Sequence, residues 1–337
     1  MKKALLILIA AICLVGIAWA SGAKEAAAGP VKLTFSTASV PNDTHTKALD
    51  VFKEELEKLS GKTVTLDYFH SGQMFSQVNE HDGVMQGKVD FIYSSASWLS
   101  EHVPTASMFG SAFTFSSYEQ MNKTLNGPIG KAIFDQAVAK LGIRPLMAWY
   151  LGTRQLNLTE KIGPVTKPEQ MSKVKLRVPN APAWIAMGKA LGANPTPMSF
   201  NEVYMGLKTG VIDGQDNPLP TDKNAKFYEV TKYIVLTNHI VDSIWPTVNE
   251  KRWQSLTAQQ KDWVMQALAK AKEFCDKTNL ENEKTLLEFF KSQGLTVIDN
   301  PDRAAFAAYA KNFYLTEGKD ISKNWDMKVY DEVQKLR

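Results

Sequence analysis

Two kinds of hydrophobic pattern alternate in the first third of the chain. Apolar residues at every second position predict strands at Val31–Thr37, Val64–Phe69 and Val89–Tyr93. Between these strands, amphipathic patterns predict helices at Thr44–Leu59 and Gln73–Met85. A succession of strand, helix, strand, helix and strand is typical of a mostly parallel sheet covered by helices.

The middle of the chain leads from this series into a second one. Helices are predicted at Tyr118–Leu125 and Gly127–Leu141, followed by a strand at Arg144–Tyr150. The chain then passes through Gly152 to Arg154, where a new succession of strands and helices begins. We therefore expect the chain to cross into a second lobe near Arg154.

The stretch from Lys173 to Pro218 is central to the second series. Arg177 lies near the end of its first predicted strand, and Asn217 follows its last one. We expect both side chains to face one crevice, because ligands bind beyond the strand ends of open α/β sheets. The predicted elements are a strand at Lys173–Val178, helices near Ala183–Leu191 and Asn201–Thr209, and a short strand from Val211 into a loop.

The last part of the chain is predicted to be mostly helical. Its one long helical pattern, Thr257–Gly294, predicts either a single helix that spans both lobes or two helices kinked near Thr278–Asn279. Before this helical pattern, two strands are predicted on either side of His239, where the chain is expected to cross back between the lobes. The remaining predictions in this part are strands at Phe227–Asn238, Ile240–Val248 and Leu295–Ile298, and helices at Pro301–Leu315 and Ile321–Leu336.

The N-terminus has the pattern of a secretory signal. Lys2 and Lys3 precede an apolar run, and Ala18-Trp19-Ala20 matches a cleavage signal, so residues 1–20 are expected to be removed. Residues 21–30 are interpreted as a flexible tether. A retained membrane anchor is the alternative, although the apolar run is short for one. The protein is therefore expected in the periplasm.

Composition excludes several other classes of protein. The 337 residues suffice for two domains of ordinary size, and 44% hydrophobic and 22% charged residues are typical of a globular protein. Cleavage would remove two lysines and lower the net charge from +4 to +2. A charge this small creates no positive electrostatic field that would attract nucleic acid. Only Cys275 would remain, so no internal disulfide and no cysteine zinc site can form.

The chain carries no recognisable set of catalytic residues. It contains neither a G-x-S-x-G nucleophile elbow, nor an H-E-x-x-H motif, nor a G-x-G-x-x-G fingerprint. The five histidines are scattered without metal-ligand spacing. We therefore expect a binding protein without metal or cofactor rather than an enzyme.

Three motifs occur in a fixed order in the second half of the chain. They are KLRVP at Lys175–Pro179, GANPTPMSFNEVY at Gly192–Tyr204 and DGQDNP at Asp213–Pro218. In order and spacing they resemble the signature of the solute-binding proteins of tripartite ATP-independent periplasmic (TRAP) transporters, the DctP family. The resemblance extends from Leu33 to Gly294 and more loosely beyond.

The resemblance implies a fold and a set of binding residues. The fold is a two-lobed α/β periplasmic-binding-protein (Venus flytrap) architecture that closes on an organic acid and delivers it to a membrane permease. The family's carboxylate-binding arginine falls on Arg177, and a second arginine, in a G-x-R context, falls on Arg154. The family's motif asparagine falls on Asn217, with Asp216 in place of the usual Glu, and its aromatic residue falls on Phe200.

Physical chemistry agrees with these implied roles. A guanidinium can hold a carboxylate through two parallel hydrogen bonds, which lysine cannot reproduce. Asn217 would donate to a remaining carboxylate lone pair once closure removes water. Without the resemblance, the alternating Lys173, Lys175 and Arg177 would be interpreted as a solvent-facing row, and Asn217 before Pro218 as a turn residue.

Departures from the resemblance bear on the ligand. In sialic-acid-binding members, a Glu and an Arg sit where Ser95 and Trp98 fall, and an Asn where Ala38 falls. The resemblance therefore disfavours sialic acid here. Aromatic residues at Trp98, Phe200, Tyr150 and Trp245 would instead suit a smaller or partly apolar acid, whereas Trp149 and Trp184 are interpreted as core residues.

The expected organisation follows from the two series and the resemblance together. Lobe one is expected to comprise residues 31–153 and 240–282, and lobe two residues 154–239 and 283–337. The expected partners are a small carboxylate and the small and large membrane subunits of a TRAP permease, and the protein is expected to be a monomer. The rival hypotheses are an exported hydrolase of small acids and a chemoreceptor or structural periplasmic module.

Overall fold

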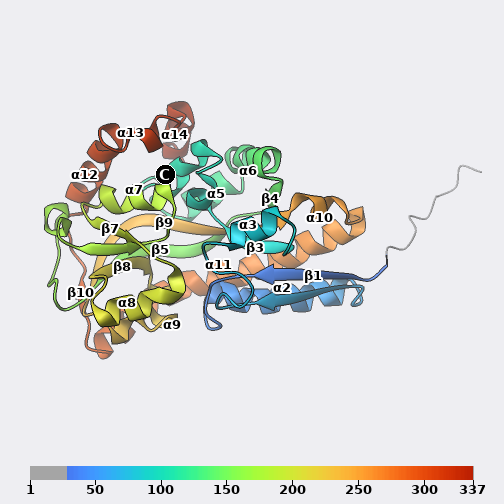
Figure 1. The fold of residues 1–337 in the computed structure, drawn as a ribbon, viewed down its shortest axis with the longest axis horizontal. Helices are drawn as coiled ribbons and strands as arrows, with labels where there is room; N and C mark the ends of the chain where they lie inside the picture. The colour runs from blue at the N-terminus through green and yellow to red at the C-terminus, as the bar shows by residue number, and fades with distance from the viewer. Residues whose placement is uncertain (1–28, 337) are drawn as a thin grey trace, which may run out of the picture. The chain divides into compact units, whose positions relative to one another are not determined.

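The computed structural model describes residues 29–336 (Figure 1). The expected signal peptide and most of the expected tether lie outside these residues. Within residues 32–336, which cluster as one compact unit, strands and helices alternate as the sequence predicts. Among the described helices, none is long and apolar enough to cross a membrane.

The first series forms much as predicted. Strand β1 (Val31–Ser36), helix α2 (Thr44–Leu59), strand β2 (Val64–Phe69), helix α3 (Glu80–Met85) and strand β3 (Phe91–Ser94) follow one another. Strands β1 and β3 are parallel. Helix α3 is shorter than predicted, because the residues before it form turns whose polar groups bond to distant parts of the chain.

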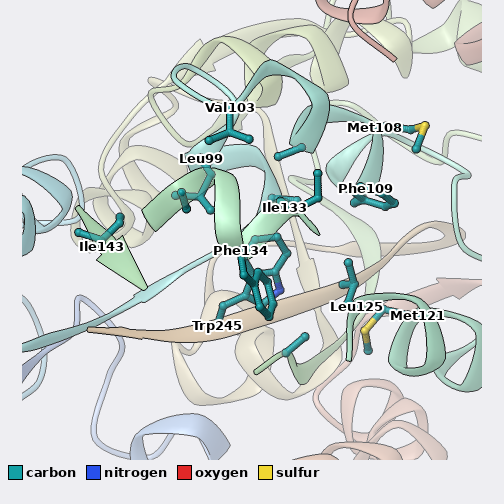
Figure 2. Packing of buried hydrophobic residues seen from close by; sticks show 14 of the residues in the cluster. Leu99, Val103, Met108, Phe109, Met121, Leu125, Ile133, Phe134, Ile143 and Trp245 are labelled. Atoms are coloured by element: carbon teal, nitrogen blue, oxygen red, sulfur yellow. The ribbon is translucent and has the colours of Figure 1, made fainter. Parts of the chain in front are cut away.

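A hydrophobic core packs beside this series. It includes residues from helices α4 (Ala96–Leu99), α5 (Tyr118–Leu125) and α6 (Pro128–Leu141) and from the 3₁₀ helix η1 (Pro104–Gly110). Figure 2 shows Phe134 against Trp245, and their ring centroids lie 5.0 Å apart. Val333, near the C-terminus, belongs to the same core. The core thereby joins segments that are far apart in the sequence.

Two long strands connect the two halves of the sheet. The predicted strand Arg144–Tyr150 is wrong: the structure has a short β4 (Ile143–Pro145) and then β5 (Trp149–Leu158). The two strands predicted around His239 are also one strand, β9 (Tyr233–Asn249). Asn238 has a positive φ of 50° inside β9, and the side-chain amide of Gln155 on β5 bonds to it. These bonds keep β9 continuous through a residue that would otherwise end it.

The second series surrounds the stretch from Lys173 to Pro218. The Asn194–Pro197 strand β7 is missing from the sequence prediction, because its two prolines argue against a strand, yet it forms an edge that tolerates them. Strand β6 is parallel to both β7 and β8. The elements are η2 (Pro168–Met171), β6 (Lys175–Val178), α7 (Pro182–Ala190), β7, η3 (Phe200–Glu202), α8 (Val203–Thr209), β8 (Gly214–Pro218), α9 (Leu219–Asn224) and η4 (Phe227–Glu229).

The described strands form one ten-stranded mixed sheet. Its order is β2-β1-β3-β9-β5-β8-β6-β7, and β4 and β10 (Thr296–Ile298) also pair with β9. Helix α11 (Ala258–Ser292) is a single helix of 35 residues, so the alternative of two kinked helices is wrong. It packs against α2 from the first series of elements, and against α9 and β10 from later in the chain. The chain is completed by α10 (Glu250–Gln254), α12 (Arg303–Leu315), α13 (Lys319–Ser322) and α14 (Met327–Gln334).

Candidate functional site

A cavity of about 90 Å³ lies where the ends of β1 and β3 face β5, β8 and α7. By the volume that one water needs in such a space, it holds roughly six to nine water-sized atoms. The cavity therefore fits a small organic molecule. Its lining comprises Thr37, Ala38, Ser39, Asp43, His45, Gln77, Glu80, Tyr93, Ser94, Ser95, Trp98, Leu151, Arg154, Pro179, Trp184, Phe200, Asn217, Thr221, Asp242, Ser243 and Ile244.

Arg154 lines this cavity from β5 and is already paired with carboxylates. Its Nε donates to Asp242 at 2.6 Å, and Nη1 lies 3.4 Å from a carboxylate oxygen of Asp216. Its guanidinium also lies over the Trp184 ring, 4.5 Å from the centroid. Burial lowers the pKa of Arg154, but the two carboxylates outweigh this effect and leave the pKa above its ordinary value. Arg154 is therefore charged and held rigidly in place.

Arg177 on β6 is buried directly behind two lining residues. Its Nε donates to the carbonyl of Met198 at 2.9 Å, and Nη2 donates to Oε1 of Gln77 at 2.8 Å. The guanidinium also lies 5.9 Å from the centroid of the Phe200 ring. Within residues 29–336 it forms no ion pair, and Nη1 forms no hydrogen bond. Burial lowers the pKa of Arg177 to about 9, although the charge of Asp216 acts in the opposite direction, so Arg177 remains charged at neutral pH without a direct ion pair.

Asn217 at the end of β8 connects the cavity to a polar layer beneath it. Its Oδ1 accepts from Nη1 of Arg154 at 3.2 Å, and its Nδ2 donates to Oε1 of Gln215 at 2.5 Å. Gln215 in turn donates to Asp222 at 2.7 Å. Burial raises the pKa of Asp222 well above its usual range. These bonds fix the orientation of the Asn217 amide and leave one of its N–H groups available.

The wall contributed by β1, β3 and α3 is acidic and polar. Asp43 and Glu80 are both buried there, and burial raises the pKa of Asp43 to about 7 and that of Glu80 well above its usual value. Among the described residues, Oε2 of Glu80 and Oγ of Ser95 have no hydrogen-bond partner. The lining residues that this wall contributes include no lysine or arginine.

Aromatic residues close the remaining sides of the cavity. Trp98 stacks on His81 with 5.3 Å between ring centroids, and Phe200 packs against Phe227. Trp184 was expected to be a core residue; it does pack in the core, but it also lines the cavity. Its Nε1 has no hydrogen-bond partner in the described part of the chain.

The structure brings six of the nine expected binding residues into this lining and places three elsewhere. Ala38, Ser95, Trp98, Arg154, Phe200 and Asn217 line the cavity, and Arg177 contacts two lining residues from behind. Tyr150 and Trp245 are buried away from it. Their chain neighbours Leu151 and Ile244 line the cavity instead, because successive strand residues point to opposite faces of a sheet.

Tyr150 and Trp245 have structural partners of their own. The hydroxyl of Tyr150 donates to Glu283 on α11 at 2.7 Å, and Nε1 of Trp245 donates to Ser243 at 2.9 Å. Four further lining residues were not among the expected binding residues: Gln77, Glu80, Asp43 and Asp242. For Gln77 and Glu80 the helical pattern predicted over residues 73–85 indicated ordinary helix positions. No local signal marks these four residues as cavity residues.

Comparison with known proteins places the chain in a family. Residues 35–319 match the family model DctP, described as bacterial extracellular solute-binding protein, family 7. The chain belongs to the DctP family of TRAP periplasmic solute-binding proteins. Members of this family are extracytoplasmic binding proteins of transporters rather than enzymes, which confirms the resemblance seen in the sequence and the expectation that the chain is not an enzyme.

Individual relatives agree with the family match. The chain is 35% identical to a solute-binding protein of Roseobacter denitrificans over 78% of its length and 80% of the relative. It is 32% identical to the sialic acid-binding periplasmic protein of Vibrio cholerae, over 80% of its own length and 84% of that protein. Among solved structures, the chain resembles a TRAP solute-binding protein of Roseobacter denitrificans with bound 3-deoxy-D-manno-oct-2-ulosonic acid, with a TM-score of 0.86 and 33% sequence identity. The match covers 91% of this chain and 100% of the Roseobacter chain. The expected α/β binding-protein fold is thereby confirmed.

Proposed function

We propose that this family member captures a small organic acid through Arg177, Arg154 and Asn217 and delivers it to the membrane subunits of a TRAP transporter. The observation that carries the proposal is the buried guanidinium of Arg177, which has no ion pair within residues 29–336 and adjoins the cavity. A buried charge without a partner is costly, so an anionic ligand would supply the missing counter-charge. The relatives named above bind sialic acid and 3-deoxy-D-manno-oct-2-ulosonic acid, both of them carboxylates.

The two arginines have different roles in this proposal. Arg154 is neutralised by Asp242 and Asp216, so it orients the ligand more than it attracts it. Arg177 forms no ion pair of its own among the described residues, and its free Nη1 would donate to the ligand carboxylate. The remaining N–H of Asn217 would donate to a carboxylate lone pair once water is excluded.

Closure of the two lobes is the proposed mechanism of capture. The lobes are proposed as residues 31–153 with 240–282 and residues 154–239 with 283–337. A ligand that binds the closed form better shifts the population toward that form. Small-angle X-ray scattering of the protein with and without ligand would test it: the radius of gyration should fall on binding.

Export is proposed to depend on residues 1–20. Cleavage after Ala20 would release a periplasmic protein that begins at Ser21. N-terminal sequencing of the protein recovered from the periplasm should show Ser21 as its first residue. Recovery of the chain with its N-terminal residues intact, in the membrane fraction, would contradict this part of the proposal.

The ligand should be identified by thermal shift and the clamp tested by substitution. A screen of mono- and dicarboxylates, sugar acids, keto acids and aromatic acids should contain acids that raise the Tm, since a ligand stabilises the state it binds. Arg177→Ala should abolish binding of such an acid in isothermal titration calorimetry, and Arg177→Lys should weaken it strongly because an ammonium group cannot keep the bonds to Met198 and Gln77 and also donate to the ligand.

The fold should tolerate both substitutions. Because Arg177 forms no ion pair among the described residues, its removal leaves no buried carboxylate without a partner. Arg303→Lys is a control, since Arg303 likewise donates two hydrogen bonds, to the backbone carbonyls of Leu236 and Asp299, but lies outside the cavity lining. An unchanged dissociation constant for Arg177→Ala would overturn the proposed clamp.

A further inference from the structure

A fully buried acid on α9 lies next in sequence to a lining residue but outside the cavity lining. Asp222 has no exposed surface, and its neighbour Thr221 lines the cavity. Among the described residues, the carboxyl group of Asp222 forms one hydrogen bond, which Oδ1 accepts from Nε2 of Gln215 at 2.7 Å, and Oδ2 has no partner. A buried acid with one such bond is less favourable for stability than an apolar side chain of similar shape. Stability alone therefore gives no reason for an acid at this position.

This acid is the last member of a chain of hydrogen bonds that begins in the cavity lining. Nη1 of Arg154 donates to Oδ1 of Asn217 at 3.2 Å, and Nδ2 of Asn217 donates to Oε1 of Gln215 at 2.5 Å. Nε2 of Gln215 then donates to Asp222. A guanidinium can only donate, so Asn217 must turn its oxygen toward Arg154 and an N–H group toward Gln215. The chain therefore has one direction and has to end on an acceptor.

Gln215 has one other acceptor among the described residues, at a longer distance. Its Nε2 lies 3.3 Å from Oδ1 of Asn157, compared with 2.7 Å from Oδ1 of Asp222. Bonds between N–H and oxygen are usually about 2.7–3.2 Å long, so Asp222 holds the Gln215 amide more firmly than Asn157 does. Without Asp222, the amide of Gln215 would be held by the longer bond alone. The support that Gln215 gives to Asn217 would weaken with it.

We infer that Asp222 is a positioning residue for the ligand: through Gln215 it holds the Asn217 amide so that the second N–H of Asn217 is aimed at the ligand carboxylate. This inference rests on the proposed function, in which Asn217 donates to the acid, and extends it to a residue outside the cavity lining. Asp222 acts without touching the ligand. Its signature is a loss of affinity that requires the side chain of Asn217.

The test measures acid binding to Asp222 variants of the full mature chain by isothermal titration calorimetry. The probes are 3-deoxy-D-manno-oct-2-ulosonic acid, L-galactonate, D-erythronate and succinate, and the one that binds the wild type most tightly is used throughout. Asp222→Leu keeps a branched side chain without the acceptor and should weaken binding about fivefold, the effect of roughly one hydrogen bond. Asp222→Asn keeps an oxygen in the place of Oδ1, so its affinity should stay within about twofold of the wild type.

A double-mutant cycle tests whether Asp222 acts through Asn217. Asn217→Ala removes the donating group, so the addition of Asp222→Leu should cause no further loss of affinity. The same fivefold loss in both backgrounds would overturn the inference. If Asn217→Ala binds too weakly to measure, the comparison of Asp222→Leu with Asp222→Asn decides. If the larger leucine prevents folding, Asp222→Ala replaces it and should show the same loss.

Asp213→Leu is the matched control. Asp213 is also buried and precedes β8, but its carboxylate accepts from Lys161 and from the N–H of Lys175 and lies outside the lining. This variant should lower the free energy of unfolding, because both donors lose their acceptor, and leave the affinity unchanged.

The outcomes separate this inference from the proposed function. An unchanged affinity of Asp222→Leu would overturn the inference while acid capture stands. A loss in Asp222→Asn equal to that in Asp222→Leu would do the same, because it would mean that the acceptor oxygen is not what matters. If neither these probes nor any acid of the thermal-shift screen binds the wild type, the proposed function and the inference both fail.

Discussion

Asp43 gives the most quantitative test of the cavity's electrostatics. It is 1% exposed, lines the cavity and precedes helix α2 without capping it through its side chain. Burial raises the pKa of Asp43 from its ordinary value of 3.8 to about 7, although the Val40 N–H and Lys47 act in the opposite direction. The folded protein therefore holds a proton on Asp43 that the unfolded chain releases in weakly acidic solution.

The sign of the effect follows from proton binding. Between about pH 4 and pH 7 the folded state binds more protons at this residue than the unfolded state, so its contribution to stability falls as the pH rises. Below pH 4 the contribution is fully present, and above pH 7 it is lost. Each pH unit corresponds to about 1.4 kcal/mol, so the full change is about 4 kcal/mol.

Asp43→Asn should remove this pH dependence. An asparagine keeps the size of the side chain and an oxygen that can accept from the N–H of Val40, which lies 3.2 Å from Oδ2 in the wild type. The free energy of unfolding of the variant minus that of the wild type should increase between pH 4 and pH 7 by about 4 kcal/mol. Above pH 7 the difference should level off.

Urea unfolding of the ligand-free protein, followed by circular dichroism from pH 4 to pH 9, measures this difference. Asp331→Asn is the control, since Asp331 is exposed on α14. Its difference from the wild type should stay flat over the same range. A flat difference for Asp43→Asn as well would refute the reasoning, because it would mean that Asp43 is ionised in the folded protein.

Three further substitutions test other contacts. Arg154→Leu should lower the free energy of unfolding by about 3–5 kcal/mol in urea, because Asp216 and Asp242 lose their partner; equal stability would contradict the ion-pair network. Gly152→Ala should cost about 1–3 kcal/mol in the same assay, since Gly152 has a φ of 133° and its Cβ would lie 2.5 Å from Pro218; a neutral effect would contradict this strain. Gln77→Ala should weaken acid binding several-fold in calorimetry, because Oε1 of Gln77 holds both Arg177 and the Phe200 N–H; unchanged affinity would contradict a role in positioning Arg177.

The sequence predicts elements best where local pattern and packing agree. The amphipathic pattern of α2 predicts its bounds as the structure has them. The prediction fails where distant contacts decide. Residues 73–79 have a helical pattern, but Gln77 bonds across to Arg177, and β7 forms despite its two prolines because it pairs with β6 at an edge.

The candidate site shows the same division. The family resemblance leads to Arg154, Arg177 and Asn217, which the structure groups at or directly behind the cavity. The predictions for Tyr150 and Trp245 miss the cavity lining by a single strand position. Side chains alternate between the two faces of a sheet, so each of these residues points away from the cavity. Asp43 and Glu80 have no local signal, because an acid beside a helix start is ordinary in sequence and becomes unusual only when the fold buries it.

The three segments that cross the middle of the chain have a mechanical consequence. Strands β5 and β9 are hydrogen-bonded to each other, with register shifts near Gly152 and Arg154, and α11 packs along β5. Sliding one half of the sheet past the other would break this ladder, whereas bending needs rotation at only a few residues. The proposed closure would therefore follow bending rather than sliding. A motion restricted in this way would cost less conformational entropy when a ligand binds.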